Sequence, residues 1–292
     1  MRLLHFSDVH VPAPRGTVSA RVLASRRLMG LVNYRLRRRH RYVDAPRKLA
    51  ELAEAVRRWE VDVVLCTGDY TIVGTDRELA HARRCVQPIV DAAGAWVTVY
   101  GNHDVYMPDS LASFERHFGD LLSTDLPEVA VDGRWPMVRF FGERVAVVCV
   151  DSARPKPDLV RSTGRVPQAQ LDALPRVLAH PRLEGRFVFL MTHYAPRLAN
   201  GEPDKATHGL ENADALLRAS DGPRGAMLFG HVHHRYHVRV PETSLTLFDA
   251  GSTTMKGHEG LWVFDVEDDR IVATPGAYRG GFVLCEHEQL TL

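Results

Sequence analysis

Polar residues follow one short apolar segment after another along the chain, and this arrangement limits the fold more than composition does. The apolar segments are rich in Val, Leu and Phe and end at Gly, Asp, Asn or His, which is typical of buried strands. They cover residues 3–7, 61–67, 95–100, 145–150 and 187–191. Helical spacing occupies residues 45–59, 77–92, 108–118 and 168–180. The alternation predicts an α/β fold with helices packed on sheets.

The last third of the chain has a different pattern. After a predicted helix at residues 211–219, five predicted strands follow closely, at 226–229, 237–240, 245–248, 261–264 and 270–274. We expect them to form a second sheet packed on the first. Because no internal repeat or low-complexity linker interrupts the sequence, we expect one domain spanning residues 1–292.

Five of the predicted strands end in residues that can bind a metal ion. Their endings are Ser7-Asp8-Val9-His10, Thr67-Gly68-Asp69, Gly101-Asn102-His103-Asp104, Thr192-His193 and Gly230-His231-Val232-His233. One such ending alone is more often a capped turn than a ligand. Five in order indicate a shared site, because functional loops of an α/β sheet gather at strand ends.

The types of donor indicate which ions would bind. Asp8 and His10 are two residues apart, so in an extended segment both side chains lie on the same side of the chain. His231 and His233 repeat this spacing. Imidazole, carboxylate and amide donors together favour Mn, Fe, Co, Ni or Zn over Mg, which prefers oxygen ligands alone.

Together these motifs resemble the calcineurin-like metallophosphoesterases, from residue 8 to about residue 233, and Ala250-Gly251-Ser252 resembles a later Gly-Ser turn of that family. The resemblance implies a four-layer α-β-β-α sandwich with two mixed sheets and a binuclear metal site at the strand ends. It also implies two ligand sets. The first ion would be held by Asp8, His10, Asp69 and His233, and the second by Asp69, Asn102, His193 and His231. His103 resembles the catalytic histidine of the family, and Asp104 its supporting residue.

This resemblance implies a hydrolase acting on phosphoric ester or phosphoanhydride bonds. Two divalent transition-metal ions, with Mn as our first choice, would clamp the phosphate and hold a bridging hydroxide for in-line attack. His103 would stabilise phosphoryl oxygens or protonate the leaving group. A non-catalytic binding scaffold on the same fold is the alternative, although the complete set of motif histidines favours turnover.

Two departures from the family pattern bear on the substrate. Tyr100 stands where many members have Pro or Leu, and Tyr70-Thr71 replace the Asp-Arg-Gly continuation of protein Ser/Thr phosphatases. The second departure argues against a phosphoprotein substrate. Bacterial phosphodiesterases for small molecules remain, and two classes share this motif order: class III cyclic-nucleotide phosphodiesterases and the diacylglucosamine pyrophosphatases of lipid A synthesis.

A basic segment follows the first strand, at about residues 16–43. No acidic residue occurs from Val9 to Val43, and eight arginines lie between Arg21 and Arg41, with apolar residues such as Leu23, Leu28, Met29 and Leu36 interleaved. This pattern predicts a helical insertion near the metal site. It would be a solvated helix with an apolar face toward the core, a cationic lid over the substrate, or a peripheral membrane contact. We favour a small-molecule or lipid-linked phosphate substrate.

Three further histidines lie in or near these segments. We expect His5, within the first strand, to be a core histidine or to support a ligand, and His234 to point away from the ions. His208 lies in a loop, where it would be solvated or would reach the substrate.

Charge and cysteine content limit which partners and which cellular compartment we expect for the protein. The chain has 37 basic and 36 acidic residues, a net charge of +1, and shows no extended basic groove with stacking aromatics, so we expect no nucleic-acid partner. Its cysteines, Cys66, Cys85, Cys149 and Cys285, are widely separated. With neither a signal peptide nor a membrane-spanning apolar run, they predict a cytoplasmic protein, in which contact with the inner membrane face remains open.

Overall fold

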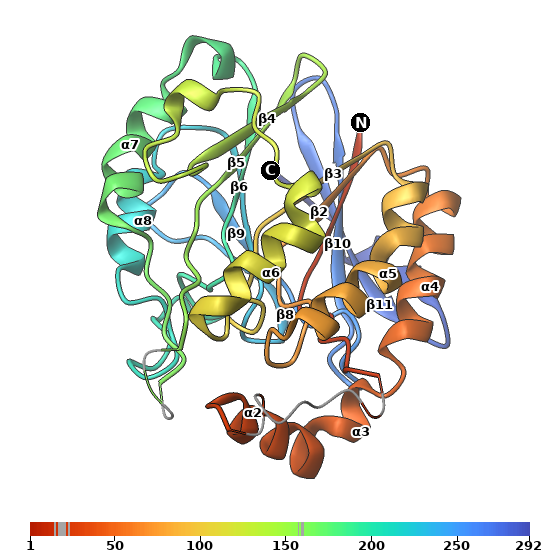
Figure 1. The fold of residues 1–292 in the computed structure, drawn as a ribbon. Helices are drawn as coiled ribbons and strands as arrows, with labels where there is room; N and C mark the ends of the chain where they lie inside the picture. The colour runs from red at the N-terminus through yellow and green to blue at the C-terminus, as the bar shows by residue number, and fades with distance from the viewer. Residues whose placement is uncertain (15, 17–21, 23, 157, 159–160) are drawn as a thin grey trace.

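The strands form two sheets that lie face to face between two layers of helices (Figure 1). This computed structural model describes residues 1–14, 16, 22, 24–156, 158 and 161–292. Helices α4 (Ala45–Arg58) and α5 (Asp76–Ala92) cover one sheet, and α7 (Gln168–Leu178) and α8 (Ala213–Ala219) cover the other. The predicted four-layer α-β-β-α sandwich is therefore confirmed.

The first sheet has the strand order β12-β11-β10-β1-β2-β3, with β13 paired to β11. Its strands are β1 (Arg2–Phe6), β2 (Val63–Cys66), β3 (Ala95–Thr98), β10 (Gly260–Val266), β11 (Ile271–Tyr278), β12 (Phe282–Leu284) and β13 (Leu290–Thr291). Strands β1, β2 and β3 run parallel, whereas β10 joins β1 antiparallel, with Leu3 opposite Phe264. Both strand directions occur in this sheet, as predicted.

The second sheet has the order β4-β5-β6-β7-β9-β8. Its strands are β4 (Met137–Phe141), β5 (Val145–Cys149), β6 (Phe187–Met191), β7 (Gly225–Phe229), β8 (Arg235–Val238) and β9 (Thr246–Ala250). Strands β5, β6, β7 and β9 are parallel, and the edge strands β4 and β8 are antiparallel.

The last third of the chain does not form a sheet of its own, contrary to our expectation. Strands β7, β8 and β9 extend the sheet that already contains β5 and β6, whereas β10 to β13 complete the first sheet. The sequence pattern locates a strand but does not identify its partner. Because most of these strands are apolar, either sheet could accept them.

Local predictions agree closely with the observed elements. Helix α6 (Pro108–Phe118) has the predicted bounds, with proline at its first position, where no intrahelical hydrogen bond is lost. Strand β4 was not predicted. It is an edge strand in which Arg139 and the two phenylalanines after it are half-buried, so its sequence lacks a continuous apolar run.

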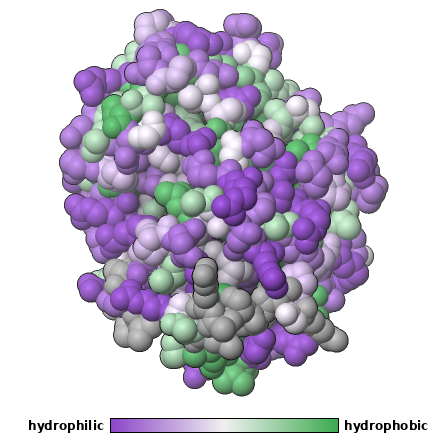
Figure 2. All heavy atoms as spheres, viewed as in Figure 1, coloured by the Kyte–Doolittle hydropathy of each residue, from purple (hydrophilic) through white to green (hydrophobic). Residues whose placement is uncertain are grey.

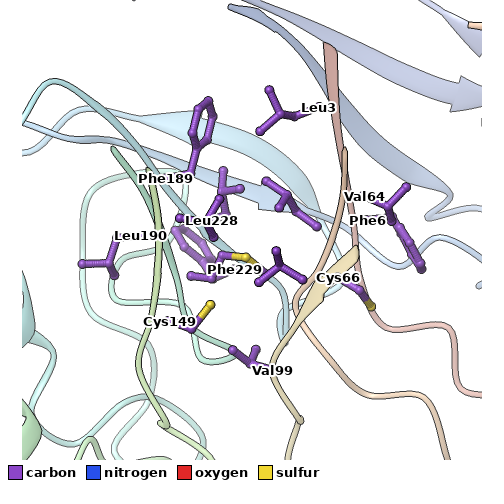
Figure 3. Packing of buried hydrophobic residues seen from close by; sticks show 14 of the residues in the cluster. Leu3, Phe6, Val64, Cys66, Val99, Cys149, Phe189, Leu190, Leu228 and Phe229 are labelled. Atoms are coloured by element: carbon purple, nitrogen blue, oxygen red, sulfur yellow. The ribbon is translucent and has the colours of Figure 1, made fainter. Parts of the chain in front are cut away.

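A continuous hydrophobic core fills the space between the sheets. Figure 3 shows side chains of both sheets in this core, with Leu3 and Phe189 between the sheets and Phe6 on the opposite face of β1. The Phe189 ring of the second sheet meets the Phe264 ring of the first edge to face, with centroids 5.3 Å apart. This packing fixes the two sheets against each other.

The basic insertion forms a separate helical layer at one end of the sandwich (Figure 1). It contains α2 (Arg27–Asn33), a π-helical turn (Tyr34–Arg38) and α3 (Arg39–Tyr42). Leu31, Tyr34 and Tyr42 pack in a small hydrophobic cluster with residues of the main domain, including Ile72 and Tyr106. Arg21 and Leu23 lie outside the described residues. No helix in the described ranges is apolar over a length sufficient to cross a bilayer.

Arg27 does not belong to the solvated basic face. Its guanidinium group is buried, forms an ion pair with Asp109 at 2.8 Å, and donates to the carbonyl of Val73 at 3.0 Å. This arginine anchors the insertion to the start of α6.

Candidate metal centre

The strands that precede the candidate ligands all end at the same end of the sandwich. Strands β1, β2 and β3 are parallel, as are β6 and β7 in the second sheet. Their carboxyl ends therefore meet at one edge. The turns that follow carry the residues predicted from the sequence: Asp8, His10, Asp69, Asn102, His103, Asp104, His193, His231 and His233.

The backbone at these turns is strained. Among the described residues, six other than glycine have positive φ, and five of them are candidate ligands: Asp8 (54°), His10 (42°), Asp69 (59°), His231 (76°) and His233 (59°). Left-handed backbone is costly for side chains with a Cβ and is concentrated at functional sites. The turns are thus shaped to aim these side chains.

One group of donors contains Asp8, His10 and His233, which together could hold a metal ion. The Nε2 atoms of His10 and His233 lie 3.1 Å apart, and Asp8 Oδ1 lies 3.0 Å from His233 Nε2. His10 Nδ1 donates to the carbonyl of Thr71 at 2.9 Å, which leaves Nε2 of the neutral ring unprotonated. Two imidazoles and a carboxylate therefore point at one position.

A second group lies beside the first. Asn102 Oδ1 is 3.0 Å from His193 Nε2 and 3.1 Å from His231 Nδ1. The other ring nitrogens donate to backbone carbonyls, His193 Nδ1 to Thr67 and His231 Nε2 to His208. This bonding leaves the two facing nitrogens as lone-pair donors.

Asp69 stands between the two groups. Its Oδ2 lies 3.7 Å from His10 Nε2 and 3.5 Å from His193 Nε2. Its other oxygen, Oδ1, accepts a hydrogen bond from the backbone N–H of His103 at 2.8 Å. One carboxylate oxygen is therefore within reach of both groups.

The electrostatics of the site suit cations. Burial, together with the charges of Asp8 and Asp104, raises the pKa of Asp69. Burial opposes ionisation of Asp8 too, but the charges and hydrogen bonds of His233 and His10 hold its pKa below the ordinary value. Burial also lowers the pKa of His10 and of His193, which favours neutral rings. Buried carboxylates facing neutral imidazoles require a compensating cation, so the donor set fits divalent ions.

Asp104 and His103 are neighbours in the motif, but their side chains bond to different partners and not to each other. The Asp104 carboxylate accepts from the backbone N–H groups of Asp69 at 2.8 Å and Thr71 at 3.1 Å. His103 Nδ1 instead donates to the carbonyl of Ile72 at 2.5 Å. Asp104 thus supports the Asp69 turn, while the Ile72 carbonyl orients the His103 ring. Burial lowers the pKa of His103 well below its ordinary value and raises that of Asp104 to about 7.

A pocket of about 600 Å³ opens above both donor groups. Its floor includes His10, Asp69, Asn102, His103, His231 and His233. Its walls come largely from the basic insertion, with Met29, Val32, Leu36, Arg37 and Arg38 among the lining residues. The segment that the sequence left open as helix, lid or membrane contact therefore forms one side of the candidate active site.

Comparison with known proteins agrees with this geometry. The profile of the calcineurin-like phosphoesterases matches residues 1–235. The chain belongs to the calcineurin-like phosphoesterase family. It is a metal-dependent phosphoester hydrolase of that family, in which a two-metal site is typical. No curated protein sequence matches it.

Several solved structures resemble this calcineurin-like phosphoesterase along most of its length. A dimetal phosphatase from Danio rerio is 15% identical, with a TM-score of 0.68 and coverage of 99% of this chain and 98% of the other. Purple acid phosphatase PPD1 from yellow lupin (Lupinus luteus) is 11% identical, with a TM-score of 0.58 and coverage of 94% and 51%. The protein TT1561 of Thermus thermophilus is 11% identical, with a TM-score of 0.52 and coverage of 90% and 93%. At these identities the likeness supports the fold alone.

Several residues around the site of this phosphoesterase could not be found from its motifs. The hydroxyl of Tyr42, at the end of the insertion, lies 3.4 Å from His233 Nδ1, and its ring meets His10 edge to face. Lys156 and Ser162 line the pocket from the loop after β5. None of the three belongs to a recognisable spacing, and only their place in the fold reveals them.

Three histidines outside the motifs, His5, His208 and His234, differ in their distance from the site. His5 is buried, with Nε2 3.0 Å from Thr67 Oγ1, as expected for a core residue. His208 lines the pocket, pairs with Asp204 and contacts the ring of His231 in a tilted arrangement, with ring centroids 4.2 Å apart. His234 is not among the described pocket-lining residues and contacts the ring of His258 instead.

The two sequence departures also have structural explanations. Tyr100 donates its hydroxyl hydrogen to Asp151 Oδ2 at 2.7 Å, linking the ends of β3 and β5. The Thr71 hydroxyl, which follows Asp69 and Tyr70, donates to the carbonyl of His103 at 2.9 Å. Ser252, from the later Gly-Ser turn, donates to the Asp8 carbonyl at 2.6 Å. These contacts hold the ligand-bearing turns in place.

Proposed function

We propose that this protein is a phosphodiesterase that hydrolyses a small or lipid-linked phosphate ester by in-line attack of a metal-bridging hydroxide. Two divalent ions, Mn first among them, would be held by Asp8, His10, Asp69 and His233 and by Asp69, Asn102, His193 and His231. One observation carries the proposal: donors from five strand ends of two sheets lie close together, and donors from four of those strand ends line the floor of a single pocket. When bound, the ions would neutralise phosphate oxygens and provide the nucleophile at neutral pH.

We propose that His103 is the residue that contacts the reacting atoms of the substrate. Its Nδ1 is engaged by the Ile72 carbonyl, so Nε2 is the nitrogen available to a phosphoryl oxygen or to the leaving oxygen. Asp104 acts indirectly, because its carboxylate holds the backbone of Asp69. We therefore assign Asp104 a positioning role and His103 the catalytic role.

The lining of the pocket supports an amphipathic substrate. Met29, Val32 and Leu36 provide apolar side chains next to the donor groups. All three are also exposed to solvent, as are Leu28 and Val43 in the same segment. An apolar rim beside a phosphate site suits a lipid-linked ester, and the basic arginines beside it suit contact with an anionic membrane surface.

We further propose one domain and a cytoplasmic location. A single hydrophobic core includes residues of both sheets, which supports one domain over residues 1–292 with the insertion at about 16–43. The four cysteines are free, which supports a reducing compartment.

The test of the function combines metal content with turnover. Purified protein should bind about two transition-metal ions per chain and hydrolyse bis-p-nitrophenyl phosphate when Mn is added. His103→Ala should keep the metal and lose activity by about 10²–10⁴-fold, whereas Asp69→Ala should lose both. Protein that binds no metal and remains inert would support the scaffold alternative. Comparing cyclic nucleotides with lipid-linked phosphates would separate the two substrate classes.

A further inference from the structure

Each candidate ligand histidine has one ring nitrogen that faces the donor groups and one that bonds outward, and the outward partner fixes which nitrogen carries the proton. For three of them this partner is a backbone carbonyl, which can only accept: Thr71 for His10, Thr67 for His193 and His208 for His231. His233 differs from these three. Among the described residues, the partner of its outward nitrogen, Nδ1, is a side chain, the hydroxyl of Tyr42 at 3.4 Å. The position of the proton in the His233 ring therefore depends on one residue of the basic insertion.

The hydrogen of the Tyr42 hydroxyl is engaged away from His233. The hydroxyl donates to Met255 Sδ at 3.1 Å. Ser252 also lies within hydrogen-bonding reach of Tyr42, but its own hydroxyl hydrogen goes to the carbonyl of Asp8 at 2.6 Å, so toward Tyr42 it can only accept. Because its hydrogen is on one of these two acceptors, Tyr42 Oη offers a lone pair to His233 Nδ1. In the neutral ring Nδ1 then carries the proton, and Nε2 keeps its lone pair.

Asp8 competes for the same proton. His233 Nε2 lies 3.0 Å from Asp8 Oδ1, so the carboxylate alone would favour the ring form that is protonated at Nε2. In that form Nε2 cannot bind a metal ion, because its lone pair is replaced by the N–H bond. Tyr42 favours the opposite form, since its oxygen accepts from Nδ1. The hydroxyl thus opposes the carboxylate and keeps Nε2 available.

The position of Tyr42 is fixed by packing as well as by its hydroxyl. The residue is 1% exposed, and its ring meets the His10 ring edge to face, with centroids 5.0 Å apart. The carbonyl of the preceding residue, Arg41, accepts from the backbone N–H of Lys256 at 2.9 Å. This bond connects the end of the insertion to the loop that carries Met255. The Tyr42 oxygen is therefore presented to His233 by a rigid part of the insertion.

We propose that Tyr42 is a positioning residue of the metal centre, which holds the proton of His233 on Nδ1 so that Nε2 can bind the first ion. The inference rests on the proposed ligand role of His233 and adds a part for the basic insertion. The insertion not only forms a wall of the pocket but also supports the ligands beneath it.

The proton position can be measured in metal-free protein. Nitrogen NMR of protein with isotope-labelled histidine separates the two neutral ring forms, and His233→Ala identifies the His233 signals by their loss. The parent protein should show the form protonated at Nδ1. Tyr42→Phe removes the oxygen and keeps the ring, so it should shift His233 toward the form protonated at Nε2, with Asp8 as the remaining acceptor. Tyr34→Phe is the matched control, because Tyr34 is buried in the same hydrophobic cluster but its hydroxyl bonds to none of the described ligand histidines.

Metal affinity gives the second measurement. Calorimetric titration of metal-free protein with Mn should show two binding steps, one of which is lost in His233→Ala. Tyr42→Phe should weaken that same step by about 10–100-fold and leave the other unchanged, because it disturbs one ligand without removing it. Tyr34→Phe should bind Mn like the parent protein.

The outcomes separate this role from the proposed function. An unchanged His233 ring form in Tyr42→Phe, equal weakening of both Mn steps, or an equal loss in Tyr34→Phe would overturn the role of Tyr42 and leave the phosphoesterase function intact. If His233→Ala keeps both Mn steps, His233 is not a ligand and the role of Tyr42 fails with it. Protein that gives the expected ring forms and Mn steps, yet hydrolyses no bis-p-nitrophenyl phosphate, would overturn the proposed function and keep the role of Tyr42.

Discussion

Single residues set the ligand geometry through close backbone packing as much as through their side chains. Gly101, the first residue of the Gly-Asn-His-Asp motif, lies against Asp69. A Cβ at Gly101 would stand 2.1 Å from Asp69 Oδ1 and 2.6 Å from the Asp69 backbone nitrogen. No side chain fits there unless the carboxylate between the two donor groups moves.

Gly101→Ala should therefore weaken metal binding without unfolding the protein. Because the change displaces Asp69 without removing it, we expect metal affinity to fall by about 10–100-fold, the range typical of residues that orient ligands. Titration of metal-free protein with Mn would measure the loss. Gly119→Ala is the matched control, since a Cβ there meets only Glu115 Oε2 at 3.7 Å. If both variants bind Mn like the parent protein, Gly101 has no role in positioning Asp69.

Motif residues could be predicted from the sequence, but the residues that support them could not. Asp8, Asn102 and His231 follow strands at recognisable spacings. Tyr42 lies near His233 only because the insertion folds back over the end of the sandwich. In the sequence, Arg27 cannot be distinguished from the exposed arginines of the insertion. Its burial is explained only by its ion pair with Asp109 in the structure.

At the level of elements, helix α5 begins in a capping arrangement with a buried acid. Thr75 Oγ1 accepts from the Glu78 backbone N–H at 3.2 Å, and Glu78 Oε2 accepts from the N–H groups of Thr75 at 3.1 Å and Val73 at 3.2 Å. Burial nevertheless raises the pKa of Glu78 from 4.5 to about 6. The cap that starts the helix thus contains a carboxyl group that is costly to ionise.

This cap should make stability depend on pH. The raised pKa means that the folded protein binds the Glu78 proton more tightly than the unfolded chain does. The contribution of Glu78 is therefore greatest below pH 4.5 and is lost as pH rises through 6, by roughly 2 kcal/mol in total. Glu78→Gln should remove this part of the dependence in urea unfolding measured from pH 4 to pH 7. Glu54→Gln, at an exposed site on α4, should keep the full dependence. An unchanged dependence in Glu78→Gln would contradict the assignment.

At the scale of the whole molecule, the two sheets form through pairing between strands that are far apart in the sequence. Local sequence patterns do not predict such pairing. Alternating apolar runs predicted the layers, and the resemblance predicted their number. Neither signal predicted that β10 pairs with β1, although most of the chain separates the two strands in sequence. The partner of a strand depends on which pairing buries its side chains in the completed sandwich.

The same packing leaves one apolar surface exposed beside the site. Hydrophobic colour gathers at the lower end of the molecule in Figure 2, where α2 lies in Figure 1. Five of the nine large hydrophobic residues exposed in the described ranges belong to this segment: Leu28, Met29, Val32, Leu36 and Val43. Exposed arginines surround them, among them Arg39 and Arg41. Apolar groups and cations on one face are typical of a surface that binds anionic lipids.

The protein should therefore bind vesicles containing phosphatidylglycerol more strongly than vesicles of phosphatidylcholine, and the difference should decrease with salt. Leu36, 79% exposed, should enter the bilayer, so Leu36→Asp should weaken cosedimentation with anionic vesicles by about tenfold or more. Val131→Asp changes an exposed apolar residue (46%) outside the insertion and should have no effect. If Leu36→Asp and Val131→Asp bind vesicles equally, the apolar rim serves the substrate and not the membrane. In that case the apolar side chains of the rim are exposed because they line the pocket in which the substrate binds.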